Sequence, residues 1–154
     1  MKASYWLFGA HQAILADAST TEGRYDYTMG CHEFGLQTPL HRHTAYSEHL
    51  FVLEGEYTAW VGDAVVVLKP EDDCFIPAGV VHTIKATGPG TSRGLNVSAP
   101  SGFVRLITGV GTPDTGDGPP PPASPDAETV ARILAEIGDE ILGPPGALPG
   151  GAKN

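Results

Sequence analysis

The sequence contains little cysteine, few basic residues and no long apolar run, and each shortage argues against a class of protein. Lys and Arg together number 9 against 18 Asp and Glu, so the net charge of −9 repels nucleic acids and anionic membranes. No apolar stretch approaches the length of a membrane span, and His11 and Gln12 interrupt the N-terminal apolar patch where a secretory signal would continue. We therefore expect a cytoplasmic protein with no nucleic-acid or membrane partner.

The two cysteines, Cys31 and Cys74, lie far apart in the sequence and form no C-x-x-C pattern. Two free thiols in a reducing compartment are the simplest interpretation, and a disulfide between them stays open. Glycine, with 20 residues, and proline, with 14, are abundant instead. Both numbers are high for a helical protein and favour a single domain of many short strands joined by turns.

Short apolar or alternating segments, separated by turn residues, occupy the first two thirds of the chain. We expect strands at residues 5–8, 12–16, 24–33, 41–43, 48–61 (a hairpin that turns at 54–56), 64–68, 74–76, 80–86, 95–98 and 103–108. The polar stretch at 17–23 is expected to be a loop. This spacing indicates an all-β fold, either an antiparallel sandwich or a barrel.

The last third of the chain has a different composition. Residues 111–125 include four consecutive prolines and no apolar core residue, which predicts an extended linker. Ser124 and Pro125 then suit the N-cap and first position of a helix, whose apolar stripe continues to Ile141 and which ends at Gly143. Such a helix must dock on the barrel or on a second subunit. The expected segments are a β-barrel at 1–110, the linker at 111–125, and a helix and tail at 126–154.

The segment from Gly35 to Gly55 carries the clearest chemical pattern. His41 and His43 are separated by one residue, so both point to the same face of a strand, where side chains alternate with a period of two. Glu48 begins the next apolar stretch, and a strand returning beside the first could add its carboxylate oxygen. His82 is the candidate for a fourth ligand. Three imidazoles and one carboxylate suit one divalent transition metal: Fe, Ni, Mn, Co, Cu or Zn.

The spacing of these residues resembles the first signature of the cupin superfamily, G-x5-H-x-H-x(3,4)-E-x6-G. The sequence fills its fixed places with Gly35, His41, His43, Glu48 and Gly55. The second signature, G-x5-P-x-G-x2-H-x3-N, is matched at Pro77, Gly79 and His82. Glu71 and Ala86 stand where that signature has a glycine and an asparagine, which are backbone and packing positions rather than metal ligands.

The resemblance implies a jelly-roll barrel, also called a double-stranded β-helix, with a short C-terminal α-helix. The runs HTAYSEHLFVLEGEYTAWVGD and PAGVVHTIKATG look like small single-domain cupins of the quercetin 2,3-dioxygenase-like kind. That likeness implies cleavage of a flavonol or related enolic aromatic by O2. The metal would be held by His41, His43, Glu48 and His82, and Glu48 would be the catalytic base that accepts the enol proton. Cupins of this kind are commonly homodimers, so a homodimer is expected.

Two other functions stay open at this point. The same ligand set could deprotonate and fold a polyketide-like substrate without oxygen, as a cyclase or isomerase. Alternatively, the chain could be a metal-bearing protein that binds a small ligand, although it has no helix-turn-helix or other output module. Oxygen consumption in the presence of substrate separates the first of these from a dioxygenase.

Three aromatic residues are candidates for the substrate pocket because they lie next to the motif residues in sequence. Tyr46 is in the loop between His43 and Glu48, and Phe34 and Phe75 each precede a strand expected to bear a ligand. Other residues near the motif are not expected to act on the metal. His49 should face away from Glu48, Arg42 should point away from the metal, and His11 and His32 are interpreted as ordinary strand or loop histidines.

Overall fold

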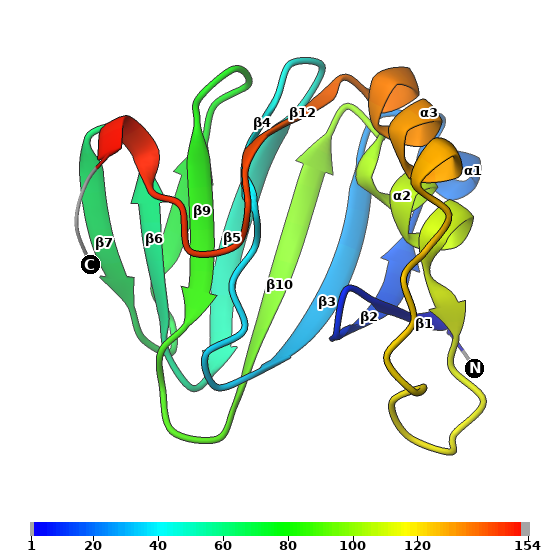
Figure 1. Cartoon of the computed structure of the whole chain (residues 1–154), viewed down its shortest axis with the longest axis horizontal. Coiled ribbons are helices and arrows are strands. Elements are labelled where there is room, and N and C mark those ends of the chain that lie inside the picture. Colours follow the sequence, from blue (N-terminus) through cyan, green and yellow to red (C-terminus); the bar gives the residue numbers. More distant parts are fainter. Residues whose placement is uncertain (1, 152–154) are drawn as a thin grey trace.

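The computed structural model describes residues 2–151 and consists mainly of two antiparallel sheets (Figure 1). The larger sheet has the strand order β11 (Thr112–Pro113), β1 (Ser4–Leu7), β2 (Ala10–Ala16), β3 (Asp26–Glu33), β10 (Thr91–Ala99), β5 (Ser47–Glu54), β8 (Asp73–Ile76). The smaller sheet has the order β12 (Asp139–Gly143), β4 (Leu40–His43), β9 (His82–Ala86), β6 (Tyr57–Val61), β7 (Ala64–Leu68). The predicted all-β jelly roll with a short C-terminal helix is confirmed. The loop expected at 17–23 contains one helical turn, α1 (Ala18–Thr21).

The barrel core lies between the two sheets. Its buried apolar residues come from both of them: Leu50, Val52, Tyr57, Ala59, Leu68 and Ala86. Strand β5 shows how the sequence selects these residues, because Glu48, Leu50 and Val52 are buried while the residues between them are exposed. Burying a large apolar side chain contributes about 1.5 to 3 kcal/mol. The alternation that builds the core therefore also brings the Glu48 carboxylate inside the barrel.

The predicted hairpin over residues 48–61 is wrong, because β5 and β6 belong to different sheets. β5 pairs with β10 and β8, whereas β6 pairs with β7 and β9. At the turn, Gly55 has a φ of +74°, and a Cβ there would lie 2.4 Å from Ser92 Oγ, so the chain passes close to β10 as it changes sheet. A turn between sheets and a hairpin turn use the same residue types, so the local sequence does not separate them.

The predicted strand over residues 103–108 is also wrong, because this segment forms helix α2 (Phe103–Val110). Its apolar residues follow the spacing i, i+3, i+4, i+7, which places them on one face of a helix: Phe103, Leu106, Ile107 and Val110. A short apolar run fits a buried strand and a buried helix equally well. Here the buried side of α2 packs against a second helix, and that contact decides the conformation.

The C-terminal helix is shorter than predicted, and a strand follows it. Helix α3 (Ala127–Ile137) begins after Asp126, whose side chain accepts a hydrogen bond from a backbone N–H of the first turn. The N-cap is therefore Asp126 rather than Ser124. The helix ends at Gly138, whose φ of +78° is the left-handed C-cap conformation, instead of at Gly143. Ile141, predicted to be helical, lies in β12, which pairs with β4.

The apolar stripe of α3 packs on α2, and Figure 1 shows the two helices side by side at one end of the larger sheet. Ile133 and Ile137 are buried there in a cluster with Leu106, Ile107 and Tyr46. The division of the chain at residue 110 stays a prediction. Strands on its C-terminal side extend both sheets, since β11 pairs with β1 and β12 pairs with β4.

Several remaining expectations concern thiols, membranes and the proline-rich segment. Cys31 on β3 and Cys74 on β8 are partly buried free thiols.

Within residues 2–151, no helix combines the length and the apolar character needed to cross a membrane. The start of the proline-rich segment is tied to the N-terminal strands, because Asp114 Oδ2 lies 3.2 Å from Ser4 Oγ and 2.9 Å from His11 Nε2.

Candidate metal centre

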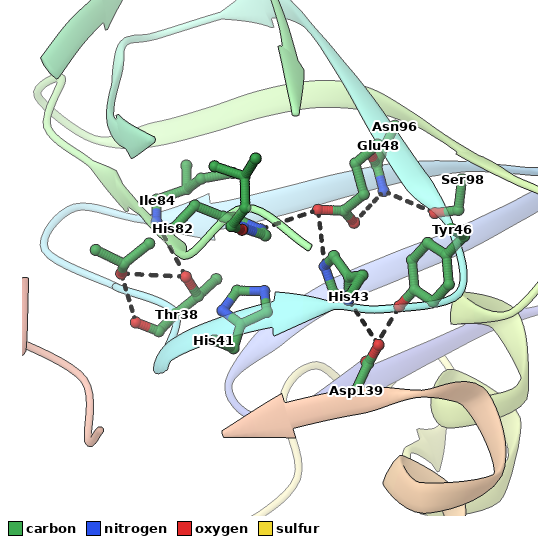
Figure 2. Close-up of polar contacts among 12 residues, drawn as sticks. Thr38, His41, His43, Tyr46, Glu48, His82, Ile84, Asn96, Ser98 and Asp139 are labelled. Atoms are coloured by element: carbon green, nitrogen blue, oxygen red, sulfur yellow. Dashed lines mark hydrogen bonds and ion pairs between the residues drawn. The ribbon is translucent and has the colours of Figure 1, made fainter. Parts of the chain in front are cut away.

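The four side chains predicted as metal ligands meet inside the barrel, although they come from two sheets (Figure 2). His41 and His43 lie on β4, and His82 lies on the neighbouring β9, where it is paired with His41. Glu48 reaches the same point from β5 in the other sheet, so the expectation that its strand returns beside β4 is wrong. One ligand atom from each residue lies within 4.8 Å of the other three, and the cluster could hold a metal ion.

On each of the three histidines, Nδ1 is held by a hydrogen-bond acceptor. The distances from Nδ1 are 2.6 Å from His41 to Pro39 O, 2.9 Å from His82 to Val80 O, and 2.6 Å from His43 to Asp139 Oδ1. Because a carbonyl or carboxylate oxygen accepts, Nδ1 carries the proton, and Nε2 of the neutral ring keeps its lone pair. Outer partners of this kind fix the orientation of metal-binding histidines.

The Nε2 atoms provide the observation that fits a metal ion. Those of His43 and His82 are buried and have no hydrogen-bond partner in the described part of the chain. They lie 3.0 and 3.3 Å from Glu48 Oε2, close enough for an ion pair but not aligned for hydrogen bonds. Leaving a buried polar atom unpaired costs about 1 to 3 kcal/mol, and a metal ion bound here would give both nitrogens a partner. Three imidazole nitrogens and one carboxylate oxygen suit a divalent transition metal.

Burial and neighbouring charges set the protonation of the cluster. Burial, together with His82 and His43, lowers the pKa of His41 to about 4, so this ring is neutral at pH 7. Burial would also lower the pKa of His43, but Glu48 and Asp139 outweigh it and raise that pKa to about 9. Burial would raise the pKa of Glu48, yet His43 and His82 hold it well below its usual range. A cation that binds here therefore meets an ionised carboxylate and takes the place of the His43 proton.

Asn96, on β10, orients the carboxylate of Glu48. Its Nδ2 donates a hydrogen bond to Glu48 Oε1 at 3.1 Å and also lies 3.4 Å from Ser98 Oγ (Figure 2). Ser98 is directly opposite Glu48 in the pairing of β10 with β5. One carboxylate oxygen is therefore fixed by the neighbouring strand, and the other, Oε2, is left to the imidazoles.

Asp139 is a functional residue that the sequence analysis missed. It is the first residue of β12 and lies opposite His43 in the pairing with β4. Its Oδ1 accepts the hydrogen bond from His43 Nδ1, and its Oδ2 accepts one from the Tyr46 hydroxyl at 3.1 Å. The buried ring of Tyr46 also stacks on the His43 imidazole, with ring centroids 4.4 Å apart. Gly138 is the local signal for this residue, because a helix predicted to end at this glycine would leave Asp139 free to begin a strand.

Two neighbouring chambers, which share wall residues such as His41 and His43, lie beside the cluster. The inner chamber, of about 130 Å³, is lined by His41, His43 and Glu48 together with apolar residues of both sheets. The outer chamber, of about 560 Å³, shares His41 and His43 and is walled by residues of α2, α3 and the chain around β12, namely Phe103, Leu106, Val130, Leu134, Ile141 and Pro145. Its volume falls within the range of about 300 to 1,000 Å³ that is usual for small-molecule sites.

None of the three aromatic residues predicted for the substrate pocket lines either chamber. Phe34 and Phe75 are 65% and 56% exposed, and Tyr46 is buried against His43. The aromatic residue that lines both chambers is Phe103, from the segment predicted as a strand. Phe75 faces outward because it alternates on β8 with the buried Ile76, whereas Phe34 and Tyr46 lie outside the strands.

The residues that were not expected to act on the metal lie in different surroundings. Arg42 faces away from the cluster, where its Nε donates to Glu140 Oε2 at 2.6 Å. His49 is exposed and contacts Asp73. His32, however, lines both chambers and is not an ordinary strand histidine.

Comparisons with known proteins agree with this architecture. Residues 31–98 match the Cupin domain family, and this span contains all four residues of the cluster. The chain is 27% identical over 124 residues to quercetin 2,3-dioxygenase from Bacillus subtilis (strain 168), which covers 80% of this chain and 36% of that protein. The chain thus spans about a third of the length of this curated relative.

Solved structures show the same fold at lower identity. A predicted oxalate decarboxylase from Thermotoga maritima aligns with a TM-score of 0.56 at 24% identity, over 59% of this chain and 80% of that one. A sugar phosphate isomerase from Silicibacter pomeroyi aligns with a TM-score of 0.54 at 21% identity, over 61% of each chain. These two likenesses concern the fold alone, which is shared by proteins named for different reactions. The family match, the two signatures and the jelly-roll topology agree that the chain contains a cupin domain.

Proposed function

We propose that this protein is a metal-dependent, quercetinase-like dioxygenase that cleaves a flavonol or a related enolic aromatic with O2. The observation that carries the proposal is the cluster of three histidines and one glutamate beside a largely apolar cavity. The distant likeness to a quercetin 2,3-dioxygenase supports the same reaction. The ligands in this proposal are His41, His43, Glu48 and His82, and they hold one divalent transition metal whose identity the donor set leaves open.

The lining of the cavity favours a neutral, mostly apolar substrate. Among the described residues, neither Lys nor Arg lines either chamber, so an anionic group placed away from the metal would have no counter-charge. The outer chamber instead offers apolar side chains such as Phe103, Leu106 and Leu134. A flat aromatic ring system can bury its faces against these side chains while its enol oxygen reaches the cluster.

Glu48 is the proposed proton acceptor. A divalent metal bound at this site would supply Lewis acidity toward the enol oxygen and electron transfer toward dioxygen. The Glu48 carboxylate is ionised and buried, and Asn96 fixes one of its oxygens while Oε2 makes no aligned hydrogen bond. A carboxylate of low pKa takes a proton only from a strengthened acid, which restricts the transfer to a hydroxyl placed directly at the cluster.

The walls of the inner chamber protect the resulting anion from water. Leu50 and Ile76 come from the larger sheet and Ile84 from the smaller one, and all three line this chamber. Apolar surroundings keep bulk water from returning a proton to the substrate before it reacts. In this proposal the barrel shapes the site and excludes water, and Glu48 accepts the proton of the substrate.

Oxygen uptake tests the proposal. The metal-free protein is reconstituted separately with each candidate metal and given quercetin in an oxygen electrode, with the flavonol followed by its absorbance. We expect coupled loss of flavonol and O2 with at least one metal, and loss of turnover in Glu48→Ala even where that variant retains metal. Full activity of metal-loaded Glu48→Ala would exclude Glu48 as the base. No flavonol cleavage with any metal would exclude the reaction.

A second candidate is a non-oxidative cyclase or isomerase of a polyketide-like substrate. The buried, ionised Glu48 beside a largely apolar cavity supports it too, because deprotonation of an enolisable substrate requires no oxygen. Substrate conversion without O2 uptake would identify this reaction. Binding of the ligand without conversion would identify a metal-bearing binding protein.

The homodimer stays a prediction. Of the two surfaces expected to form it, the apolar stripe of α3 is largely occupied by α2 within the chain. Phe8, among the N-terminal aromatic residues, is 52% exposed and remains available. Light scattering coupled to size-exclusion chromatography determines the mass in solution.

A further inference from the structure

The cavity contains a second group of polar residues, which the proposed reaction does not use. Gln12 on β2 and His32 on β3 each line both the inner and the outer chamber. Gln12 as a residue is only 6% exposed, and its side-chain amide makes no hydrogen bond with the described residues while its atoms keep some accessible surface. An amide at a cavity wall finds its partner in a cavity water or in a polar group of a bound ligand.

Gly30 provides the space that these two side chains share. It lies opposite Gln12 in the pairing of β2 with β3. A Cβ at position 30 would lie 2.7 Å from His32 Cε1 and 3.3 Å from both Nε2 and Oε1 of Gln12. Gly30 has no positive φ, so the backbone conformation does not require glycine here. The absence of a side chain is what keeps Gln12 and His32 together at the cavity wall.

Tyr57 determines which nitrogen of His32 is free. The buried Tyr57 hydroxyl lies 2.9 Å from His32 Nδ1 and has no other partner among the described residues. This hydrogen bond occupies Nδ1 in either tautomer and leaves Nε2 as the ring nitrogen available to a ligand. Burial lowers the pKa of His32 to about 4, which keeps the ring neutral at pH 7. Together the two residues offer an amide donor, an amide acceptor and one imidazole nitrogen, without charge.

We propose that Gln12 and His32 form a second binding subsite, which hydrogen-bonds a neutral hydroxyl or carbonyl group of the substrate away from the enol at the metal cluster. The inference rests on the proposed function and specifies which flavonols the site would prefer. A flavonol with further ring hydroxyls satisfies the amide and the imidazole, whereas one without them leaves both unpaired in an apolar site. The uncharged pair also disfavours a carboxylate or phosphate at this position.

Anaerobic binding to the metal-loaded protein tests the subsite, because turnover cannot occur without O2. The two probes are quercetin, which has hydroxyls on both outer rings, and 3-hydroxyflavone, which has the enol hydroxyl alone. Affinities are measured by isothermal titration calorimetry. We expect the wild type to prefer quercetin by about 10-fold or more, and Gln12→Leu and His32→Phe each to reduce that preference to within about 3-fold.

A matched control separates the subsite from general effects of substitution. In His49→Phe the lost imidazole lies on the outside of the barrel and lines neither chamber. This variant should keep the wild-type preference. Thermal unfolding checks the fold of each variant, and Gln12→Leu alone carries the test if His32→Phe does not fold.

The two proposals fail in distinguishable ways. If the wild type binds both flavonols but Gln12→Leu keeps the wild-type ratio of affinities, the subsite is wrong and the proposed function stands. The subsite is equally wrong if the wild type shows no preference between the two flavonols. If the wild type binds neither flavonol with any of the candidate metals, the result contradicts both the proposed function and the subsite.

Discussion

Two parts of the chain meet at His43, and they contribute different things to the site. The motif segment, residues 35–82, provides the four side chains of the cluster. The C-terminal segment, residues 126–143, provides none of them, but Asp139 holds His43 at its other ring nitrogen, and α3 and β12 wall the outer chamber. The candidate ligands and the residues that orient them therefore come from different parts of the sequence. The ligands depend on spacing within a motif, whereas their orientation depends on how a distant segment packs.

Removal of a motif residue should have the largest effect. His82 is fully buried and pairs with His41 across two neighbouring strands. We expect His82→Ala to weaken metal binding by more than about 100-fold and to abolish turnover, because a missing ligand costs more than a missing outer partner. Metal titration of the apo protein measures this. His49→Ala, on the outer face of β5, is the control, and equal weakening in both variants would contradict the assignment.

Damage to the packing of the C-terminal segment should act on stability first. Ile133 is 1% exposed between α3 and α2. Ile133→Ala leaves a cavity there, and we expect the free energy of unfolding to fall by about 2 to 5 kcal/mol in chemical denaturation. Leu142→Ala, at a position in β12 that is 47% exposed, should change it little. Equal effects of the two substitutions would show that α3 is not part of the folded unit.

Removal of the charge on Asp139 tests the link between the two parts. Asp139→Asn keeps the shape of the side chain but removes the carboxylate that fixes the tautomer of His43. We expect metal affinity to fall by about 10- to 100-fold while the fold is retained. The matched control is the next residue, Glu140→Gln, which loses an exposed pair with Arg42. If metal affinity is the same in Asp139→Asn and in the wild type, the C-terminal segment has no part in the metal centre.

The smallest predicted effect is a loss of folding stability at acidic pH. The pKa of His32 is about 4 in the folded chain and near 6.5 when unfolded, so between these values the unfolded state binds more protons. This contribution to stability is complete above pH 6.5 and is lost as pH falls toward 4, with a slope of at most about 1.4 kcal/mol per pH unit. Unfolding of metal-free protein at a series of pH values should show a shallower slope for His32→Asn. Identical slopes would contradict burial of His32.

The sequence allowed the ligand set to be proposed because its signal is local. His41 and His43 share a strand face by the period of two, and the alternation of β5 turns Glu48 inward with Leu50 and Val52. The sheet in which Glu48 lies could not be predicted. A turn at Gly55 looks the same whether β6 pairs with β5 or crosses to the other sheet.

The support of the site was much harder to predict, because it depends on contacts between distant residues. Asp139 and His43 are separated by 96 positions, and nothing in the residues around Asp139 marks a partner for an imidazole. The apolar run of α2 was assigned to a strand, which hid the contribution of Phe103 to the cavity. Gln12 and His32 became candidates only when the structure placed both on the wall of the same cavity.

The central claim is that four side chains hold one metal ion inside the barrel, and anomalous diffraction tests it most directly. A crystal of the reconstituted protein is measured at the absorption edge of the added metal. We predict a single strong peak per chain, within bonding distance of the imidazoles of His41, His43 and His82 and of the Glu48 carboxylate. A peak elsewhere on the chain, or no peak in protein exposed to saturating metal, would contradict the account.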